Sequence, residues 1–327
     1  MQFDKFRDRK VLITGGLGFI GSNLARRLVE LGADVTVVDT LFPNYGGNRF
    51  NLGDCESRVR INLSDMRNVF ALREMVQDVE VIFNLAGQTS HLDSMHDPTT
   101  DLEINCAAQL SLLETCRRQN PEARIVFAST RQIYGRPDYL PVDEAHPLRP
   151  TDVNGINKMA GESYHLLYSR VYGMGAVALR LTNTYGPRMR IKDARQTFLG
   201  VWIRQALDGR PFEVWGGEQL RDFSYVDDVV DAFLAAAQSP ALDGQAFNLS
   251  GEPVISLKGL ADMLVEEAGA AYEIREFPAE RKRIDIGDYY ADDRRFREAT
   301  GWAPKVPLAK GLKLTLDYYR QHLAKYL

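Results

Sequence analysis

Cysteine is scarce in this sequence, and it has no long hydrophobic run. The three cysteines, Cys55, Cys106 and Cys116, lack the C-x-x-C spacing and the paired histidines of a zinc site, so we expect reduced, partly buried thiols and no bound metal. No apolar run approaches the roughly 20 residues that cross a bilayer. The charged N-terminal stretch leads directly into a predicted strand. We therefore expect a cytoplasmic protein without a membrane partner.

An excess of positive charge is also missing. The 40 Lys and Arg residues against 44 Asp and Glu residues give a formal net charge of −4, which argues against nucleic acid as a partner. Hydrophobic residues make up 45% of the 327 residues and charged residues 26%. This composition allows a sizeable core and excludes a disordered or fibrous chain.

Short β-rich segments alternate with helical stretches through the first half of the chain. Residues 10–14 (KVLIT) form the first expected strand, and residues 19–31 carry apolar side chains at helical spacing after a glycine-rich turn. Further strands are expected at residues 35–39, 59–63, 81–85, 125–129 and 176–181. Because these runs lack polar alternation, helices are expected on both faces of the sheet. The pattern predicts an α/β fold with a doubly wound parallel sheet.

Glycines follow the first expected strand at a spacing typical of dinucleotide binding. Gly15, Gly18 and Gly21 lie in TGGLGFIG, which opens the first helix, and Asp39 ends the next strand about 20 residues later. Glycine lets the backbone approach a pyrophosphate, and the helix N-terminus offers free N–H groups. The Asp39 carboxylate would accept hydrogen bonds from ribose hydroxyls and repel a 2′-phosphate. The pattern predicts NAD in preference to NADP; the alternative is a glycine turn that binds nothing.

The second half of the sequence differs in the length and spacing of its predicted elements. Prolines and paired glycines separate shorter elements, and no second glycine-rich fingerprint appears. We expect residues 1–182 to form an NAD-binding Rossmann domain and residues 183–327 a smaller α/β lobe that binds the substrate. Segments near residues 223–250 are expected to cross back to the first domain.

Further motifs run nearly from end to end of the chain. They are NLAG at 84–87, FASTRQIYG at 127–135, LRLTNTYGPR at 179–188, RDFSYVDD at 221–228, and Ala291-Asp292 followed by GWAPK. With the glycine turn, they resemble the extended short-chain dehydrogenase/reductase family, of the nucleotide-sugar epimerase/dehydratase type exemplified by UDP-glucose 4-epimerases. The resemblance implies an NAD site made by Gly15, Gly18, Phe19, Ile20, Gly21, Asp39, Leu63, Leu85, Ala86, Gly87, Asn105, Lys158 and Leu181.

One family motif is altered. The family's central dyad is Tyr-x-x-x-Lys, in which the phenol serves as the base, whereas the equivalent segment here runs from Asn154 to Lys158 as NGINK. A carboxamide does not accept a proton near pH 7, so Asn154 is expected to hold or orient a sugar hydroxyl. The substitution is open to three explanations: native chemistry, a decayed activity or an introduced change.

The residues after Thr130 distinguish branches of the family. Related 4,6-dehydratases carry an Asp-Glu pair there, and decarboxylating relatives carry a Glu at the second position, but this chain has Arg131 and Gln132. Dehydration and decarboxylation are therefore disfavoured. The resemblance then implies C4 epimerisation of a UDP-hexose through a transient 4-keto sugar, with Thr130, Asn154 and Lys158 as the catalytic set. The alternatives are an oxidoreductase with net NAD turnover and a catalytically impaired binding protein.

The hydroxyl proton of the sugar still needs an acceptor. Lys158 is the first candidate, because an amine beside the nicotinamide charge and away from water has a lowered pKa. Thr130 is expected to bridge the reacting oxygen to Lys158 or to a water. Tyr134 and His91 are weaker candidates.

The resemblance also implies a nucleotide-sugar site. Its members are His91, Asn183, Thr197, Phe198, Trp215, Arg221, Lys282 and Asp285. The planar Arg221 guanidinium suits a diphosphate, although a surface ion pair with Asp222 is the alternative. One of the basic residues 281–283 is expected near the diphosphate, and Trp215 either stacks on the base or belongs to the core. The basic stretch 188–195 is either a solvated loop or a contact to an acidic sugar such as a uronic acid.

Two helical stretches, residues 99–119 and 155–172, carry more apolar positions than one face of a sheet requires. In relatives the equivalent helices pair into a four-helix interface, so the resemblance implies a homodimer. A monomer with these faces covered by other segments is the alternative.

Overall fold

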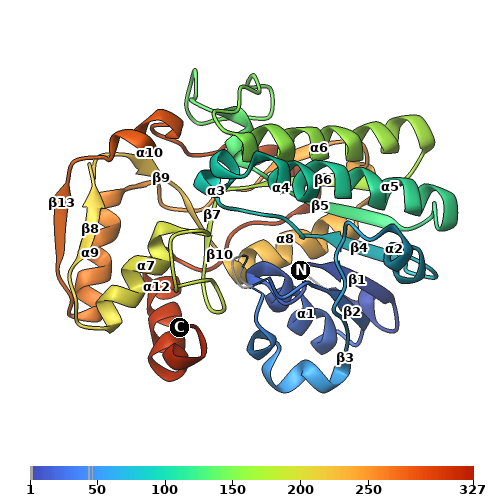
Figure 1. Ribbon diagram of the computed structural model, residues 1–327, viewed down its shortest axis with the longest axis horizontal. Coiled ribbons are helices and arrows are strands. Elements are labelled where there is room, and N and C mark those ends of the chain that lie inside the picture. Colours follow the sequence, from blue (N-terminus) through green and yellow to red (C-terminus); the bar gives the residue numbers. More distant parts are fainter. Residues whose placement is uncertain (1–2, 43–44, 46) are drawn as a thin grey trace.

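A seven-stranded parallel sheet forms the centre of the larger lobe of the molecule (Figure 1). The computed structural model describes residues 3–42, 45 and 47–327, with the backbone alone at residues 280 and 281. The strand order is β11-β6-β5-β4-β1-β2-β3. The bounds are β1 Lys10–Thr14, β2 Asp34–Val38, β3 Val59–Asn62, β4 Val81–Asn84, β5 Arg124–Thr130, β6 Ala176–Leu181 and β11 Ala246–Asn248. The doubly wound α/β fold predicted from the sequence is confirmed.

Helices cover both faces of this sheet, which explains why its strands are apolar on both sides. On one face, α1 and α8 pack together, and Leu24, Leu28 and Phe233 are completely buried there. On the other face, α2, α5 and α6 enclose a second apolar core. The bounds are α1 Phe19–Glu30, α2 Val69–Met75, α5 Ala108–Gln119, α6 Val153–Tyr172 and α8 Val226–Ala237. Both α8 and β11 come from the segment near 223–250, and β11 pairs with β6 at the edge of the sheet.

Short helical pieces connect β4 to α5 along one side of the site. They are α3 (His91–His96), α4 (Pro98–Leu102) and a π-helical turn, η4 (Glu103–Ala107). The Asp97 side chain caps α4 by accepting a hydrogen bond from Thr100 N, and Pro98 occupies the first helical position. Asp152 caps α6 in the same way through Gly155 N, and Gly173 ends α6 in the left-handed conformation.

The second lobe is built from small sheets and helices around its own apolar core, which contains Trp202 and Phe212. It occupies the other end of the molecule (Figure 1). Its strands pair two by two: β7 (Asn183–Tyr185) with β10 (Phe223–Tyr225), β9 (Leu220–Arg221) with β12 (Ile255–Ser256), and β8 (Phe212–Trp215) with β13 (Tyr272–Arg275). Its helices are α7 (Phe198–Leu207), α9 (Leu257–Ala268), α10 (Ala279–Ile284) and α12 (Leu308–His322), while α11 (Arg294–Thr300) packs near β11.

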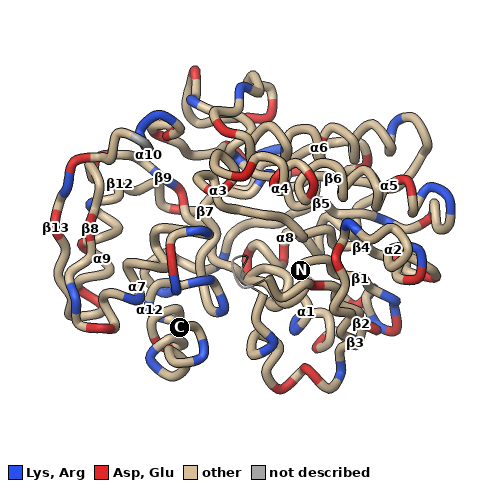
Figure 2. The backbone as a smooth tube through the Cα atoms, viewed as in Figure 1, with Lys and Arg blue, Asp and Glu red and all other residues tan. Residues whose placement is uncertain are grey.

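The distribution of charged residues and the state of the cysteines agree with the composition of the sequence. Basic and acidic residues are interspersed along the backbone trace (Figure 2). Cys55, Cys106 and Cys116 are free, and burial raises the pKa of the Cys116 thiol to about 12. Within the described part of the chain, no helix combines the length and apolar character needed to traverse a bilayer.

Candidate active site

The first cavity lies at the carboxyl ends of the central strands, over the glycine turn. Gly15 has a φ of +68°, and a Cβ on it would lie 3.0 Å from the backbone nitrogen of Ala86. A Cβ on Gly21 would collide with the carbonyl oxygen of Gly15. Only glycine therefore lets β1, the turn and the start of α1 approach one another this closely, which leaves the turn backbone bare toward the cavity.

Asp39 lies beside this turn, directly after β2. Its carboxylate accepts hydrogen bonds from the backbone N–H groups of Leu17 at 3.1 Å and Leu41 at 2.9 Å. Burial raises the pKa of Asp39, and these N–H groups oppose the shift. The strand end thus presents a held carboxylate at one end of the cavity, where a ribose would need hydroxyl acceptors.

Most of the residues predicted to bind the cofactor line this cavity. They are Gly15, Gly18, Phe19, Ile20, Gly21, Asp39, Leu85, Ala86, Gly87, Lys158 and Leu181. Leu63 and Asn105 are not among the described lining residues: Leu63 is 54% exposed, and Asn105 is completely buried. The chain after β3 instead contributes Asp65 and Met66, which the sequence analysis missed because the expected strand extended to residue 63.

Lys158 comes from the first turns of α6 and lines the first cavity. Its Nζ donates to the carbonyl oxygen of Ala128 at 3.3 Å and sits 5.1 Å from the centroid of the Phe127 ring. A Cβ on Gly87 would lie only 2.8 Å from this Nζ, so a larger residue there would displace the end of the lysine side chain. Desolvation lowers the pKa of Lys158 to about 8, although Asp101 opposes the shift.

Asn154 belongs to a buried network centred on Asp101, which is 1% exposed. Asp101 Oδ2 accepts hydrogen bonds from the amide nitrogens of Asn154 and Asn105, each at 3.0 Å, and Oδ1 accepts one from Asn157 at 2.8 Å. Asn154 Nδ2 also donates to the carbonyl oxygen of Gln88 at 2.8 Å. The amide nitrogen of Asn154 thus donates hydrogen bonds to buried acceptors, and these bonds connect α6 to α4 and to the loop after β4. Nothing in the sequence pattern marked Asp101.

Thr130 ends β5 on the wall of the same cavity. Its hydroxyl accepts a hydrogen bond from Gln132 N at 3.2 Å and so caps the short turn η5 (Arg131–Tyr134). The hydroxyl retains its proton for donation to a bound group.

A second cavity lies between the sheet and the second lobe. Of the predicted substrate residues, it is lined by His91, Asn183, Thr197, Phe198, Trp215, Arg221 and Asp285. Lys282 is not among its described lining residues; its side chain is exposed, and its carbonyl oxygen accepts a hydrogen bond from Arg136. The side chain of Arg281 lies outside the described residues.

Arg221 is the buried cation of this second cavity, with only 5% of its surface exposed. Its guanidinium donates to the carbonyl oxygens of Leu220 and Gly287, and it lies 3.5 Å from Asp285 Oδ1. Burial lowers the pKa of Arg221 to about 10. The alternative of a surface ion pair with Asp222 is therefore wrong: Asp222 is completely buried and accepts hydrogen bonds from Thr182 and Ala291.

The two cavities share part of their walls. The residues that line both are His91, Arg131, Gln132, Asn183, Gln196 and Thr197, which we call the junction. A dinucleotide bound over the glycine turn and an anionic ligand bound at Arg221 could therefore contact each other at the junction.

Comparison with a family model identifies the protein family. The model of the NAD dependent epimerase/dehydratase family matches residues 11–250. The chain belongs to this family. The resemblance seen in the sequence is therefore confirmed, and the cofactor of the protein is NAD.

Relatives and solved structures of the family agree over nearly the whole chain. A putative UDP-glucose 4-epimerase of Methanocaldococcus jannaschii is 33% identical over 317 residues, which cover 95% of this chain and 99% of that protein. The structure of UDP-glucose 4-epimerase from Thermotoga maritima with UDP-glucose has a TM-score of 0.87 and 30% identity, and covers 96% of this chain and 99% of that one. UDP-glucuronic acid 4-epimerase from Bacillus cereus, solved with UDP-glucuronic acid and NAD, has a TM-score of 0.83 and 26% identity, with coverage of 96% and 99%.

Other relatives in the family bear the names of a UDP-glucuronic acid decarboxylase and a dTDP-glucose 4,6-dehydratase. The comparisons thus establish the nucleotide-sugar epimerase/dehydratase class, and the reaction has to be argued from the site.

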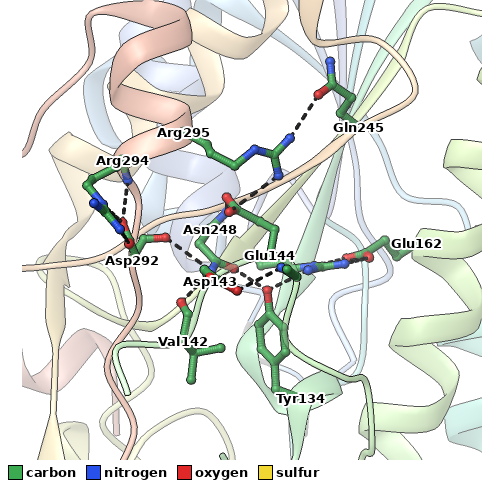
Figure 3. Close-up of polar contacts among 12 residues, drawn as sticks. Tyr134, Val142, Asp143, Glu144, Glu162, Gln245, Asn248, Asp292, Arg294 and Arg295 are labelled. Atoms are coloured by element: carbon green, nitrogen blue, oxygen red, sulfur yellow. Dashed lines mark hydrogen bonds and ion pairs between the residues drawn. The ribbon is translucent and has the colours of Figure 1, made fainter. Parts of the chain in front are cut away.

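Tyr134, which the sequence offered as a weaker candidate for the base, lies in a buried hydrogen-bond network. Its hydroxyl donates to Asn248 Oδ1 at 2.7 Å (Figure 3). The same hydroxyl accepts from Arg180 Nη1 at 2.6 Å, and Arg180 also binds Glu162. Burial raises the pKa of Tyr134 to about 12. Tyr134 is not among the described lining residues of either cavity, and it links η5 to β6 and β11.

The basic stretch 188–195 is mostly engaged in structural contacts. Arg188 donates to Asn51 O at 3.0 Å and to Asn23 Oδ1 at 2.8 Å. Arg190 pairs with Asp193 at 2.6 Å, and Arg195 pairs with Asp93 at 2.8 Å. Only Arg195 of these arginines is among the described residues of the second cavity.

Proposed function

We propose that the protein is an NAD-dependent epimerase that inverts C4 of a UDP-hexose. The observation that carries this proposal is the junction, where the cofactor cavity meets a second cavity with a buried arginine. A sugar whose diphosphate is held by Arg221 would extend toward the nicotinamide end of the first cavity. Relatives named as UDP-glucose 4-epimerases support this choice of reaction.

The residues of the first cavity fit NAD. The bare turn at Gly15 and Gly21 suits a pyrophosphate, and Asp39 offers oxygens to the adenosine ribose. When bound, NAD accepts a hydride from the sugar carbinol and returns it to the opposite face, without net redox change. Lys158 lines this cavity beside Gly87, and we assign it to the ribose nearest the reacting ring.

The residues after Thr130 argue against loss of water or carbon dioxide. Gln132 donates its amide to Asp152 Oδ2 at 2.7 Å, and Arg131 is a cation. The wall therefore lacks a free carboxylate at the two positions that follow Thr130. Thr130 keeps a hydroxyl available for the reacting oxygen.

Incubation with UDP-, GDP-, CDP- and dTDP-sugars, followed by mass spectrometry and NMR, tests the proposal. The expected product is the C4 epimer of a UDP-hexose, formed without accumulation of NADH. Steady NADH formation would indicate an oxidoreductase and contradict the epimerase. Loss of water or carbon dioxide would indicate a dehydratase or decarboxylase, and recovery of every bound sugar unchanged would indicate a binding protein.

A second candidate substrate is a UDP-hexuronic acid, and Arg131 is the observation that favours it. Arg131 lines the junction, and its Nε has no hydrogen-bond partner. Among the described residues, no carboxylate lies within 4.0 Å of the Arg131 guanidinium. The guanidinium instead lies 5.6 Å from the centroid of the Tyr289 ring. An unpaired arginine beside the sugar is well suited to a carboxylate. A higher kcat/KM for UDP-glucuronic acid than for UDP-glucose would select this candidate.

A further inference from the structure

We propose that His91, oriented by Asp152, takes up the sugar hydroxyl proton in place of the tyrosine that the family motif lacks here. The inference rests on the proposed function, because it names the proton acceptor of that reaction. It replaces Lys158 as the base and leaves Lys158 with the cofactor.

The position of His91 is the first argument. His91 begins α3, its side chain is 39% exposed, and it lines both cavities. Thr130, Asn154 and Lys158 are described as lining only the first cavity. Of the residues at the junction, His91 and Arg131 have ionisable side chains, and an arginine stays protonated at neutral pH. His91 is thus the junction residue able to take and return a proton there.

The buried carboxylate behind the ring is the second argument. Nδ1 of His91 lies 2.9 Å from Asp152 Oδ2, although this short contact is not aligned as a hydrogen bond. Contacts of this kind often tighten only when a substrate binds. The Asp152 side chain is completely buried and also accepts hydrogen bonds from Gly155 N and Gln132 Nε2, each at 2.7 Å.

Asp152 remains ionised in this setting. Burial works against its charge, but the contacts with His91, Gly155 N and Gln132 lower the pKa of its carboxyl below the ordinary value. A fixed carboxylate at Nδ1 favours the imidazolium that forms when Nε2 accepts a proton. Within the described part of the chain, no hydrogen bond engages Nε2, so it is available to a ligand.

The other charges near His91 leave this pairing in place. On the wall of the second cavity, the carboxylate of Asp93 is paired with Arg195 at 2.8 Å. Arg131 contributes a positive charge at the junction, and the amine of Lys158 lies in the cofactor cavity. Asp152 is therefore the anion that contacts the ring, and it offsets the two cations.

In the proposed step the O–H and C–H bonds of the carbinol would break and a C=O bond would form. Nε2 of His91 would take the proton, and NAD, when bound, would supply the hydride acceptor. In the return step His91 gives the proton back to the new alkoxide. Asp152 acts as a positioning residue and does not itself change protonation state.

The first test compares His91→Gln with His96→Gln in the NAD-loaded protein. Both histidines lie on α3, but His96 is not a described lining residue of either cavity. We expect His91→Gln to lower kcat by about 10²- to 10⁴-fold and to leave KM within about threefold, since the base acts in the transition state. His96→Gln is expected to retain wild-type turnover.

Asp152→Asn tests the positioning role, because asparagine keeps the cap of α6. It is expected to lower kcat and to change the acidic limb of the pH profile of kcat/KM, with the fold intact by circular dichroism. An acidic limb identical to that of the wild type would contradict the role of Asp152.

A labelling measurement adds a readout that does not depend on turnover. Diethyl pyrocarbonate modifies histidines, and peptide mass spectrometry locates the product. In the NAD-loaded protein we expect UDP-glucose to protect His91 and UDP alone to leave it reactive, with His96 modified equally in both samples. Equal modification of His91 in both samples would contradict its place beside the sugar.

The outcomes separate this inference from the proposed function. If the wild type epimerises a nucleotide sugar and His91→Gln does so at a rate within about threefold of it, the inference falls and the proposed function stands. If the wild type converts no nucleotide sugar, both fall.

Discussion

At the scale of single residues, Asn154 is integrated into its surroundings. Its amide joins α6 to Asp101 and to the Gln88 carbonyl, and two further asparagines complete the coordination of that carboxylate. A chance loss of a catalytic tyrosine would not by itself supply such matched partners. The network therefore supports adaptation of the site in preference to decay.

Restoring the family tyrosine is expected to harm this protein. Asn154→Tyr would remove the hydrogen bonds of the Asn154 amide to Gln88 and Asp101 and insert a larger side chain at a position that is only 2% exposed. We expect destabilisation by about 1–3 kcal/mol and slower turnover, measured by chemical denaturation and by product NMR. Faster turnover on the true substrate would instead mark Asn154 as a lost base.

The buried amine of Lys158 predicts a pH-dependent stability. Its pKa falls from 10.5 in the unfolded chain to about 8 in the folded protein, so the unfolded state binds more protons between these values. The free energy of unfolding of the wild type should therefore rise with pH through this window, relative to Lys158→Met, by about 3 kcal/mol at most. Urea denaturation of both proteins across the window measures the difference, and a constant difference would contradict the shift.

At the scale of elements, the turn between β1 and α1 depends on close backbone approach. Gly21→Ala would press a Cβ against the Gly15 carbonyl, and we expect at least a tenfold loss of NAD affinity. Gly175→Ala is the matched control, because its nearest neighbour would lie 3.5 Å away and its φ is not positive. Calorimetric titration with NAD measures both variants, and equal affinities would remove the glycine turn from the cofactor site.

The periodic elements were predictable from the sequence, and the interrupted ones were not. Strands β1 to β6 follow their apolar runs within about two residues. The helix expected at 99–119 is instead divided into α4, the π-helical turn η4 and α5. Asn105 in this turn contacts Asp101 one helical turn earlier, whereas Asn154 and Asn157 of α6 reach Asp101 through tertiary contacts that no periodicity encodes.

The site shows the same division. The spacing of the glycine turn and Asp39 predicts their role, because they belong to one local βαβ unit. The contact between His91 and Asp152 joins residues far apart in the sequence, and so does the pairing of Arg221 with Asp285. Such pairs arise only from packing, which explains why the sequence offered Lys158 as the first candidate for the base and only Asp222 as an ion-pair partner for Arg221.

At the scale of the whole molecule, one face of the helical layer exposes apolar side chains. Leu102 of α4 and Ile156, Leu167 and Val171 of α6 are each between 43% and 60% exposed. We propose that this face forms a homodimer, because burying it removes apolar surface from water.

Sedimentation of Leu167→Glu tests the dimer. The wild type is expected to sediment as a dimer at micromolar concentration and Leu167→Glu as a monomer. Phe70→Glu is the control, because Phe70 of α2 is 78% exposed but lies on another helix. A single-chain mass for the wild type would exclude the dimer.

In the proposed reaction the sugar at the junction gives its C4 hydride to NAD and receives it back. UDP-glucose and UDP-glucuronic acid that carry deuterium at C4 test this transfer, with product NMR in ordinary water. We expect one of them to yield its C4 epimer with the deuterium still at C4. An epimer that has exchanged this deuterium for solvent hydrogen, or no epimer from either sugar, would contradict it.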